Sequence, residues 1–220
     1  FAHTFFSYIP NSAQVAFHGL LEALWTEGLA EDQPVRFGQI AVKDAKFRTF
    51  IADAAARREF YKHVYDVTYG LVKPGVDTLV VLDDSIVRGN TMRNAILPML
   101  DRLGPKRIVV VSSAPPIAYP DCYGIDMSSL GELVAFKALL KLRRDDVPRN
   151  PDALRAAYAA IPLSEFSKAI AALLTPPEMK AKVDVIFQSM PNLRKACPMT
   201  TGDWYFTGNY PTPGGERVLQ

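Results

Sequence analysis

The run LVVLDDSIVRGNT at residues 79–91 constrains the fold of this chain more than any other segment. Four apolar residues that favour β-structure lead directly into two carboxylates, Asp83 and Asp84. A turn of small and hydroxyl-bearing residues follows as far as Thr91, and a helical pattern begins at Met92. The segment therefore predicts a buried strand that ends in acid and leads into the N-terminus of a helix.

Such a junction suits a phosphorylated sugar. The free N–H groups and the positive dipole end of a helix N-terminus attract an anion such as phosphate. Carboxylates at a strand end suit ribose hydroxyls or a hard cation such as Mg²⁺. Many α/β proteins also end a strand with Asp and cap the next helix with Ser or Thr, so the segment alone leaves both interpretations open. The phosphate-loop pattern GxxxxGK[ST] and the dinucleotide pattern GxGxxG are both absent.

The rest of the N-terminal half alternates strand and helix patterns. Apolar residues with helical spacing predict a helix over 15–25 that ends at Gly28, and a second helix over 92–103 with a kink at Pro98. Strands are expected at residues 3–9, 35–42, 79–82 and 107–112. This order predicts an α/β fold with a parallel sheet flanked by helices, whose ligands bind beyond the carboxyl ends of the strands.

The pattern changes after residue 127. The sequences SLGE (129–132) and TPPE (175–178) each fit a capping box, which predicts helices over 130–142 and 176–189. Residues 143–152 read as a polar connector. The chain is therefore expected to be one domain, with a core at 1–127 and a mostly helical C-terminal cover region at 128–220.

Composition excludes some classes of function. The net charge is +2 on 25 basic and 23 acidic residues, which argues against a nucleic-acid or membrane surface. The apolar runs are shorter than the roughly 18 residues that a membrane span needs. The two cysteines, Cys122 and Cys197, lie too far apart to suggest a disulfide framework and fit a reducing cytoplasm.

Several motifs carry a resemblance to a known family. Residues 79–91 resemble the phosphoribosyl pyrophosphate (PRPP) motif of type I phosphoribosyltransferases, and the SIVRGNT part most resembles the glutamine PRPP amidotransferases (amidophosphoribosyltransferases). FFSYIPNSAQVA (5–16) is similar to the pyrophosphate loop of that family, and VKDAKFRTFI (42–51) to its flexible loop. SSAPPIAYPDCYGIDM (112–127) and YFTGNYPTPGG (205–215) match further segments in the same order. An ordered series of motifs is more specific than any one of them.

The chain also departs from the family pattern. Asn11 stands where an acid is common, and Ala52-Asp53 replaces a familiar Met-Pro. Some members hold an iron–sulfur cluster on four cysteines, so with two cysteines no such cluster is expected here. Because the chain starts at Phe1, it is expected to be a fragment without the N-terminal glutaminase domain of the family.

The resemblance implies an enzyme. The expected reaction transfers ammonia, derived from glutamine through the missing domain, to C1 of PRPP, and it forms 5-phosphoribosylamine in the first step of de novo purine synthesis. Mg²⁺ is the expected cofactor, PRPP and ammonia are the expected partners, and the parent protein is expected to be a cytoplasmic homo-oligomer. The sequence leaves two alternatives open: a PRPP-binding regulatory domain without catalysis, and a salvage phosphoribosyltransferase that uses a nucleobase.

The resemblance also implies a role for individual residues. The residues expected to act in catalysis are Asp83, Asp84 and Arg48. Those expected at the 5-phosphate are Ser85, Ile86, Val87, Arg88, Gly89, Asn90 and Thr91. Those expected at the pyrophosphate are Asn11, Ser12, Ala13, Lys43 and Thr49, and the metal ligands would be Ser12, Asp83 and Asp84.

Overall fold

The computed structural model describes most of the chain, in two compact units. The described residues are 1–10, 12–28, 34–43, 65–122, 127, 129–144, 146, 148, 150–198 and 202–219, without the side chains of 42, 43 and 65. The first unit consists of Phe1–Asp84, Asn90–Ser113 and Leu174–Asp184. The second consists of Ser85–Gly89, Ala114–Leu173 and Val185–Gln220.

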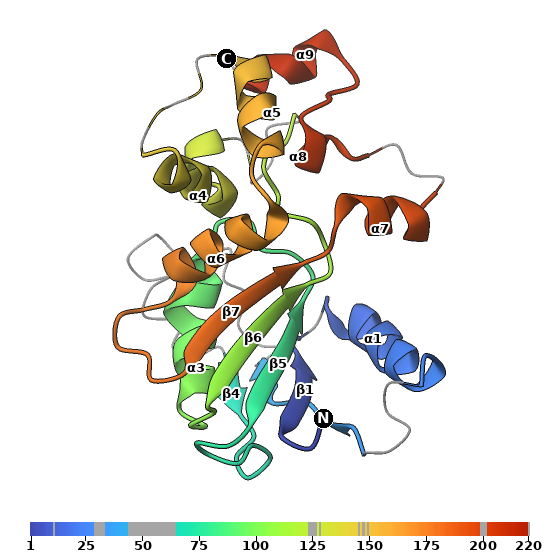
Figure 1. Cartoon of the computed structure of the whole chain (residues 1–220), viewed down its shortest axis with the longest axis vertical. Coiled ribbons are helices and arrows are strands. Elements are labelled where there is room, and N and C mark those ends of the chain that lie inside the picture. The colour runs from blue at the N-terminus through green and yellow to red at the C-terminus, as the bar shows by residue number, and fades with distance from the viewer. Residues whose placement is uncertain are drawn as a thin grey trace. The chain divides into compact units, whose positions relative to one another are not determined.

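A five-stranded parallel sheet organises the chain, as the strand and helix patterns predict (Figure 1). Its order is β2 (Arg36–Phe37), β1 (Thr4–Tyr8), β5 (Thr78–Asp83), β6 (Arg107–Ser112) and β7 (Lys182–Phe187). A separate antiparallel pair contains β3 (Ala41–Lys43) and β4 (Tyr65–Val67). The single strand expected over 35–42 is therefore wrong, because the chain leaves the main sheet after Phe37 and enters the small one at Ala41.

The connections of the sheet put helices on both of its faces. The chain passes from β1 outward to β2 through α1 (Gln14–Thr26), and from β5 in the other direction to β6 through η2 (Met92–Ile96) and α3 (Leu97–Asp101). Parallel crossovers are right-handed, so two crossovers that run in opposite directions place their helices on opposite faces. The sheet is accordingly covered by α1 on one face and by α3 on the other (Figure 1).

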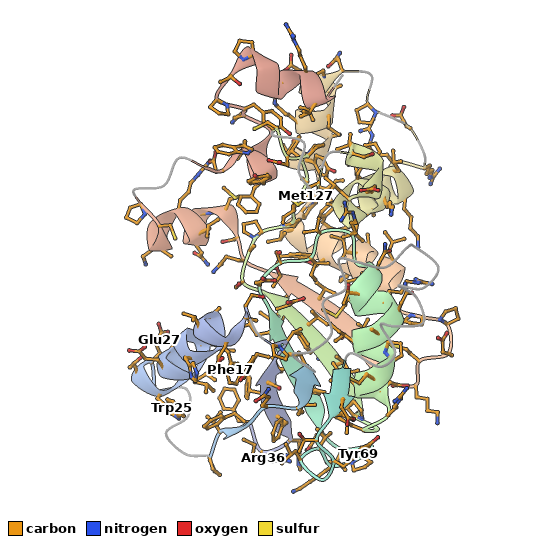
Figure 2. The ribbon with its side chains drawn as sticks, turned by 180° about the vertical axis from the view of Figure 1, so that it is seen from behind. Phe17, Trp25, Glu27, Arg36, Tyr69 and Met127 are labelled. Atoms are coloured by element: carbon orange, nitrogen blue, oxygen red, sulfur yellow. The ribbon has the colours of Figure 1, made fainter. Side chains whose placement is uncertain are left out.

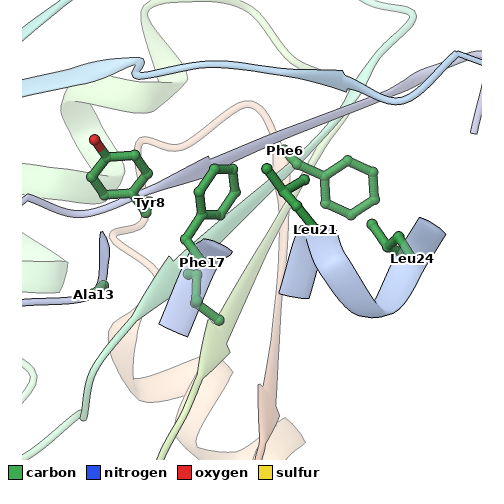
Figure 3. Packing of buried hydrophobic residues seen from close by; sticks show 7 residues of the cluster. Phe6, Tyr8, Ala13, Phe17, Leu21 and Leu24 are labelled. Atoms are coloured by element: carbon green, nitrogen blue, oxygen red, sulfur yellow. The ribbon is translucent and has the colours of Figure 1, made fainter. Parts of the chain in front are cut away.

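Helix α1 is fixed by an apolar stripe. Phe17, Leu21 and Leu24 recur at helical spacing and are buried against Phe6 and Tyr8 of β1, as Figure 3 shows. The rings of Tyr8 and Phe17 lie 5.0 Å apart. Burying one such side chain stabilises the fold by about 1.5–3 kcal/mol, so this stripe holds the helix against the sheet. The helix expected over 15–25 is confirmed.

The helix after β5 begins with a wide turn. Residues Met92–Ile96 form a π-helix, and the α-helical part starts at Leu97, whose N–H donates to the carbonyl of Met92. Pro98 lacks an N–H and its ring would crowd the carbonyl four residues before it, so a widened turn accommodates it. The helix was expected to kink at Pro98, and the structure has a π-helical turn before this residue instead.

The expectation of a helix over 176–189 is wrong. The structure places the strand β7 at Lys182–Phe187, and it is the edge strand next to β6. Residues 182–187 read KVDVIF, with three β-branched residues, which suits a strand that pairs with a neighbour. The capping-box pattern at 175–178 is only a local signal, and the pairing of the strand overrides it.

The second unit is mostly helical, as expected. Its elements are η3 (Leu130–Glu132), α4 (Val134–Leu142), α5 (Pro151–Ala159), α6 (Leu163–Leu174, which ends in the first unit), α7 (Met190–Ala196), α8 (Trp204–Thr207), α9 (Pro213–Glu216) and η4 (Arg217–Leu219). Among the described helices none alone could span a membrane; α5 and α6 reach the required length and hydropathy only as a pair bent by 101°.

Tyrosines link the segment 118–121 to the C-terminal residues in this unit. The carbonyl of Tyr205 accepts the N–H groups of Ala118 and Tyr119 at 2.9 and 3.1 Å. The hydroxyl of Tyr205 donates to Asp121 at 2.9 Å, and that of Tyr210 to the carbonyl of Pro120 at 2.8 Å. Two motifs that are far apart in the sequence therefore form one packed structure.

Gly208 makes this packing possible. It ends α8 with φ +71°, a conformation that favours glycine, and Arg155 donates to its carbonyl at 2.8 Å. A Cβ atom at this position would lie 2.5 Å from the Cε1 atom of Tyr119, whose side chain is fully buried.

We therefore expect Gly208→Ala to lower the free energy of unfolding by about 2–4 kcal/mol, the sum of a left-handed backbone and an overpacked ring. Gly214→Ala is the matched control, because a Cβ there meets only the Thr212 hydroxyl at 3.9 Å. Chemical denaturation of both variants measures the difference. Equal stability of the two variants would contradict the role given to Gly208.

In the first unit, a partly buried ion pair joins β2 to the turn before β5. Arg36, labelled in Figure 2, donates to Oδ2 of Asp77 at 2.8 Å, and the N–H of Lys73 donates to the same oxygen at 2.7 Å. The side chain of Asp77 is completely buried. Burial alone would raise the pKa of Asp77, but the Lys73 N–H and the Arg36 guanidinium outweigh it and lower the pKa.

We expect Asp77→Asn to destabilise the protein by about 2–3 kcal/mol, because it removes a charge-assisted hydrogen bond in a buried place. The control is Asp184→Asn, which breaks the more exposed pair with Arg107 and should cost less than about 1 kcal/mol. The contribution of Asp77 should be present above its unfolded pKa of 3.8 and fade as the pH falls below that value. Urea denaturation at pH 7 and pH 3 tests both expectations.

Candidate functional site

The carboxyl ends of β1 and β5 form a topological switch point. These two strands are neighbours, and the chain continues from β1 to one side of the sheet and from β5 to the other. Ligands of open parallel sheets bind beyond the strand ends at such a point. The loop after β1 leads to Ser12 and Ala13, and the end of β5 carries Asp83 and Asp84. The predicted pyrophosphate loop and the predicted 5-phosphate loop therefore start at the same edge of the sheet, from neighbouring strands.

Hydrogen bonds fix the backbone at this edge. The N–H of Ile9 donates to the carbonyl of Leu82 at 2.8 Å, and the N–H of Ser113 donates to the carbonyl of Asp83 at 3.0 Å. The Ser113 hydroxyl donates to the carbonyl of Asp84 at 3.1 Å. Three successive carbonyls of the 82–84 segment are thus held by the ends of β1 and β6.

The acidic pair is electrostatically unfavourable when both members are ionised. Burial, and then the nearby charge of Asp84, raises the pKa of Asp83 to about 7. The N–H of Asp84 donates to Oδ1 of Asp83 at 3.0 Å and opposes part of this rise. Carboxyl groups with strongly raised pKa values are frequent at functional sites, which makes Asp83 a candidate site residue.

Asn90 and Thr91 lie at the start of the helix that follows. Asn90 is exposed, and Thr91 precedes η2 without a side-chain capping bond. Both belong to the first unit together with Ser12, Ala13, Asp83 and Asp84. These six predicted site residues therefore belong to the same unit.

Residues Ser85–Gly89 belong to the second unit, where α4 and η3 hold them. Ile86 is buried, and the carbonyl of Val87 accepts the N–H of Val134 at 2.9 Å. Arg88 forms an ion pair with Glu132 through two nitrogens, each 2.9 Å from Oε2. Gly89 has φ +76°, so this turn requires glycine. The side chain of Arg88, predicted at the phosphate, is thus directed by a carboxylate.

The pyrophosphate residues are only partly described. Ser12 is exposed, whereas Ala13 is fully buried in the cluster of Figure 3, so Ala13 has only its backbone to offer a ligand. Lys43 is placed in β3 by its backbone alone. The predictions for Asn11, Arg48 and Thr49 fall outside the described residues.

Sequence reasoning missed two residues that organise these segments. Ser113 binds the backbone of the acidic pair, and Glu132 binds Arg88. A signal for Ser113 was present, because a serine directly after a strand lies at the carboxyl edge of a parallel sheet. Glu132 carries no such signal, since only the folded chain brings it to residue 88.

We expect Asp83→Asn to raise the melting temperature at pH 8, because it removes a carboxylate that burial makes unfavourable. The pKa of Asp83 is raised, so its contribution to stability is complete below the unfolded pKa of 3.8 and is lost as the pH rises through about 7. The difference between variant and parent should therefore be smallest near pH 4 and largest above pH 7. Thermal unfolding from pH 4 to 8 measures it, and a constant difference would contradict the assignment.

Comparisons with known proteins find similar sequences and structures, although no protein-family model matches the chain. The amidophosphoribosyltransferase of Mycobacterium tuberculosis is 38% identical over 109 residues, which are 49% of this chain and 20% of that protein. The Staphylococcus epidermidis protein of the same name is 35% identical over 132 residues, 58% of this chain and 24% of that protein.

Solved structures extend the similarity over nearly the whole chain. The glutamine PRPP amidotransferase from B. subtilis, complexed with ADP and GMP, superposes with a TM-score of 0.56 and 26% identity over 96% of this chain and 38% of that one. A structure described as the allosteric regulatory enzyme of purine biosynthesis gives a TM-score of 0.56 and 28% identity, over 95% and 37%. The chain spans 20–24% of the length of the two curated relatives described above. In sequence and in fold, the chain is similar to the phosphoribosyltransferase region of the amidophosphoribosyltransferases.

Proposed function

We propose that this chain binds PRPP and transfers its phosphoribosyl group to ammonia, with 5-phosphoribosylamine and pyrophosphate as products. The observation that carries the proposal is the acidic pair Asp83–Asp84 at the carboxyl end of β5, next to the end of β1 at the switch point of the sheet. The similarity to amidophosphoribosyltransferases gives the substrate class.

The acidic pair is suited to a sugar and a cation. In this proposal Asp83 and Asp84 accept hydrogen bonds from the ribose hydroxyls, and together with Ser12 they are the residues that would hold Mg²⁺. Two carboxylates and a hydroxyl are oxygen ligands of the kind that this cation prefers. The raised pKa of Asp83 fits such a role, because a nearby cation favours the ionised form that burial disfavours. Bound Mg²⁺ would neutralise part of the charge on the pyrophosphate.

The phosphate groups of PRPP need hydrogen-bond donors, and the resemblance assigns residues of this chain to that role. Residues 85–91 would bind the 5-phosphate, chiefly through backbone N–H groups and the hydroxyls of Ser85 and Thr91. Gly89 already has the left-handed conformation that such a turn uses. The pyrophosphate would be bound by Asn11, Ser12, Ala13, Lys43, Arg48 and Thr49. Since Glu132 pairs with Arg88, the backbone would contribute more to phosphate binding than that side chain.

Catalysis of this reaction requires mainly that the reactants are positioned correctly and that developing charge is stabilised. The nitrogen of ammonia forms a bond to C1 as the bond from C1 to the pyrophosphate oxygen breaks, pyrophosphate leaves with the electron pair, and the nitrogen loses a proton. The transition state has oxocarbenium character, so groups that orient the ribose lower the barrier by holding the reacting atoms in place. The hydrogen bonds that fix residues 82–84 give the acidic pair such an orientation.

The decisive experiment measures pyrophosphate release from PRPP and Mg²⁺ with ammonium chloride or with glutamine, while the unstable amine is trapped enzymatically. We expect product with ammonia. Binding of PRPP without release of pyrophosphate would instead favour a regulatory domain, and release that depends on a nucleobase would favour a salvage enzyme. The cytoplasmic location, the homo-oligomer and the absence of nucleic-acid and membrane partners stay predictions.

We expect Asp84→Asn to weaken PRPP binding by about 10- to 100-fold, the loss of a hydrogen bond to a charged group, without unfolding the protein. Glu22→Gln on the exposed side of α1 is the control, since it removes the same charge far along the helix from Ser12. The thermal shift produced by PRPP and Mg²⁺ should shrink in the first variant alone. An equal shift in Asp84→Asn and the parent would remove Asp84 from the site.

A further inference from the structure

We infer that Ser113 is a positioning residue that orients the acidic pair for its ligand, an inference that rests on the proposed PRPP site. Ser113 is the first residue after β6, and it is half-buried beside the end of β5. One residue makes two hydrogen bonds to the acidic segment, from its N–H to the carbonyl of Asp83 and from its hydroxyl to the carbonyl of Asp84.

The direction of these bonds shows what the hydroxyl does. Carbonyls of a strand alternate between its two neighbours. The carbonyl of Leu82 points to β1, where the N–H of Ile9 meets it, and the carbonyl of Asp83 points to β6, where the N–H of Ser113 meets it. A continuing strand would turn the carbonyl of Asp84 back toward β1. The Ser113 hydroxyl binds it instead on the β6 side, at 3.1 Å.

The hydroxyl therefore stabilises the bend that ends β5. The strand stops at Asp83, and Asp84 has a bent backbone. The bend also brings the N–H of Asp84 to the Asp83 carboxylate at 3.0 Å, so the same geometry orients the Asp83 side chain. Because both bonds from Ser113 go to backbone carbonyls of the acidic pair, Ser113 acts on the ligand through that pair.

Three variants test this role. Ser113→Ala removes the hydroxyl and keeps the N–H bond, and Ser113→Thr restores the hydroxyl. Thr26→Val is the matched control, because it removes a hydroxyl-to-carbonyl bond of 2.9 Å, from Thr26 to Glu22, at the far end of α1 in the same unit. Calorimetry with PRPP and Mg²⁺ gives the dissociation constant of each 220-residue variant, and amide hydrogen exchange by NMR reports on the N–H of Asp84.

We expect the dissociation constant for PRPP to rise about fivefold in Ser113→Ala, as the loss of one ordinary hydrogen bond implies, and to stay within about twofold of the parent in the other two variants. The N–H of Asp84 should exchange about fivefold faster in Ser113→Ala, with or without PRPP. Binding equal to the parent in Ser113→Ala, or a loss in Thr26→Val as large as in Ser113→Ala, would overturn the inference.

The two readouts separate this inference from the proposed function. A parent chain that does not bind PRPP would refute the proposed function, whatever the exchange data show. Exchange of the Asp84 N–H that is unchanged in Ser113→Ala would refute the positioning role, whether or not PRPP binds. A Thr variant as weak as the Ala variant would also refute it, because the hydroxyl would then not be the group that matters.

Discussion

The backbone ladder of β5 is the constraint on which the site depends. This strand is paired on both sides, residue by residue, with Thr4–Tyr8 on β1 and with Arg107–Ser112 on β6. A central strand cannot slip by one residue without turning its whole buried face, with Leu79 and Val81, outward. The position of Asp83 at the sheet edge is therefore set by apolar residues that take no part in any chemistry.

The elements around this strand could be predicted from the sequence because their local and tertiary preferences agree. β1, α1, β5 and β6 all appear at the expected places, since each combines a clear apolar period with a defined stop such as Gly28 after α1. The switch point then follows from the order of the connections. For the same reason, the residue pattern alone is enough to place the acidic pair at the sheet edge.

The rest could not be predicted, for identifiable physical reasons. The strand β7 follows a capping-box pattern, and only its place next to β6 decides in favour of a strand. The π-helical turn at Met92–Ile96 accommodates Pro98. A proline in a helical pattern predicts that the helix is interrupted, but it does not predict whether the interruption is a kink or a widened turn. The contacts of Arg88 with Glu132 and of Asp121 with Tyr205 join residues 44 and 84 positions apart, which no local pattern reveals.

At the acidic pair, the stability of the fold conflicts with the proposed function. A carboxyl group whose pKa is raised to about 7 by burial and a neighbouring charge destabilises the fold wherever it is ionised. The surrounding chain nevertheless supplies hydrogen bonds from Ile9 and Ser113 that keep the segment in place instead of letting it relax toward water. A ligand that binds only the folded pair would return stability through its own binding energy. An arrangement that is costly without a ligand and rigidly held is what a preorganised binding site requires, since the ligand then meets groups that need not reorganise.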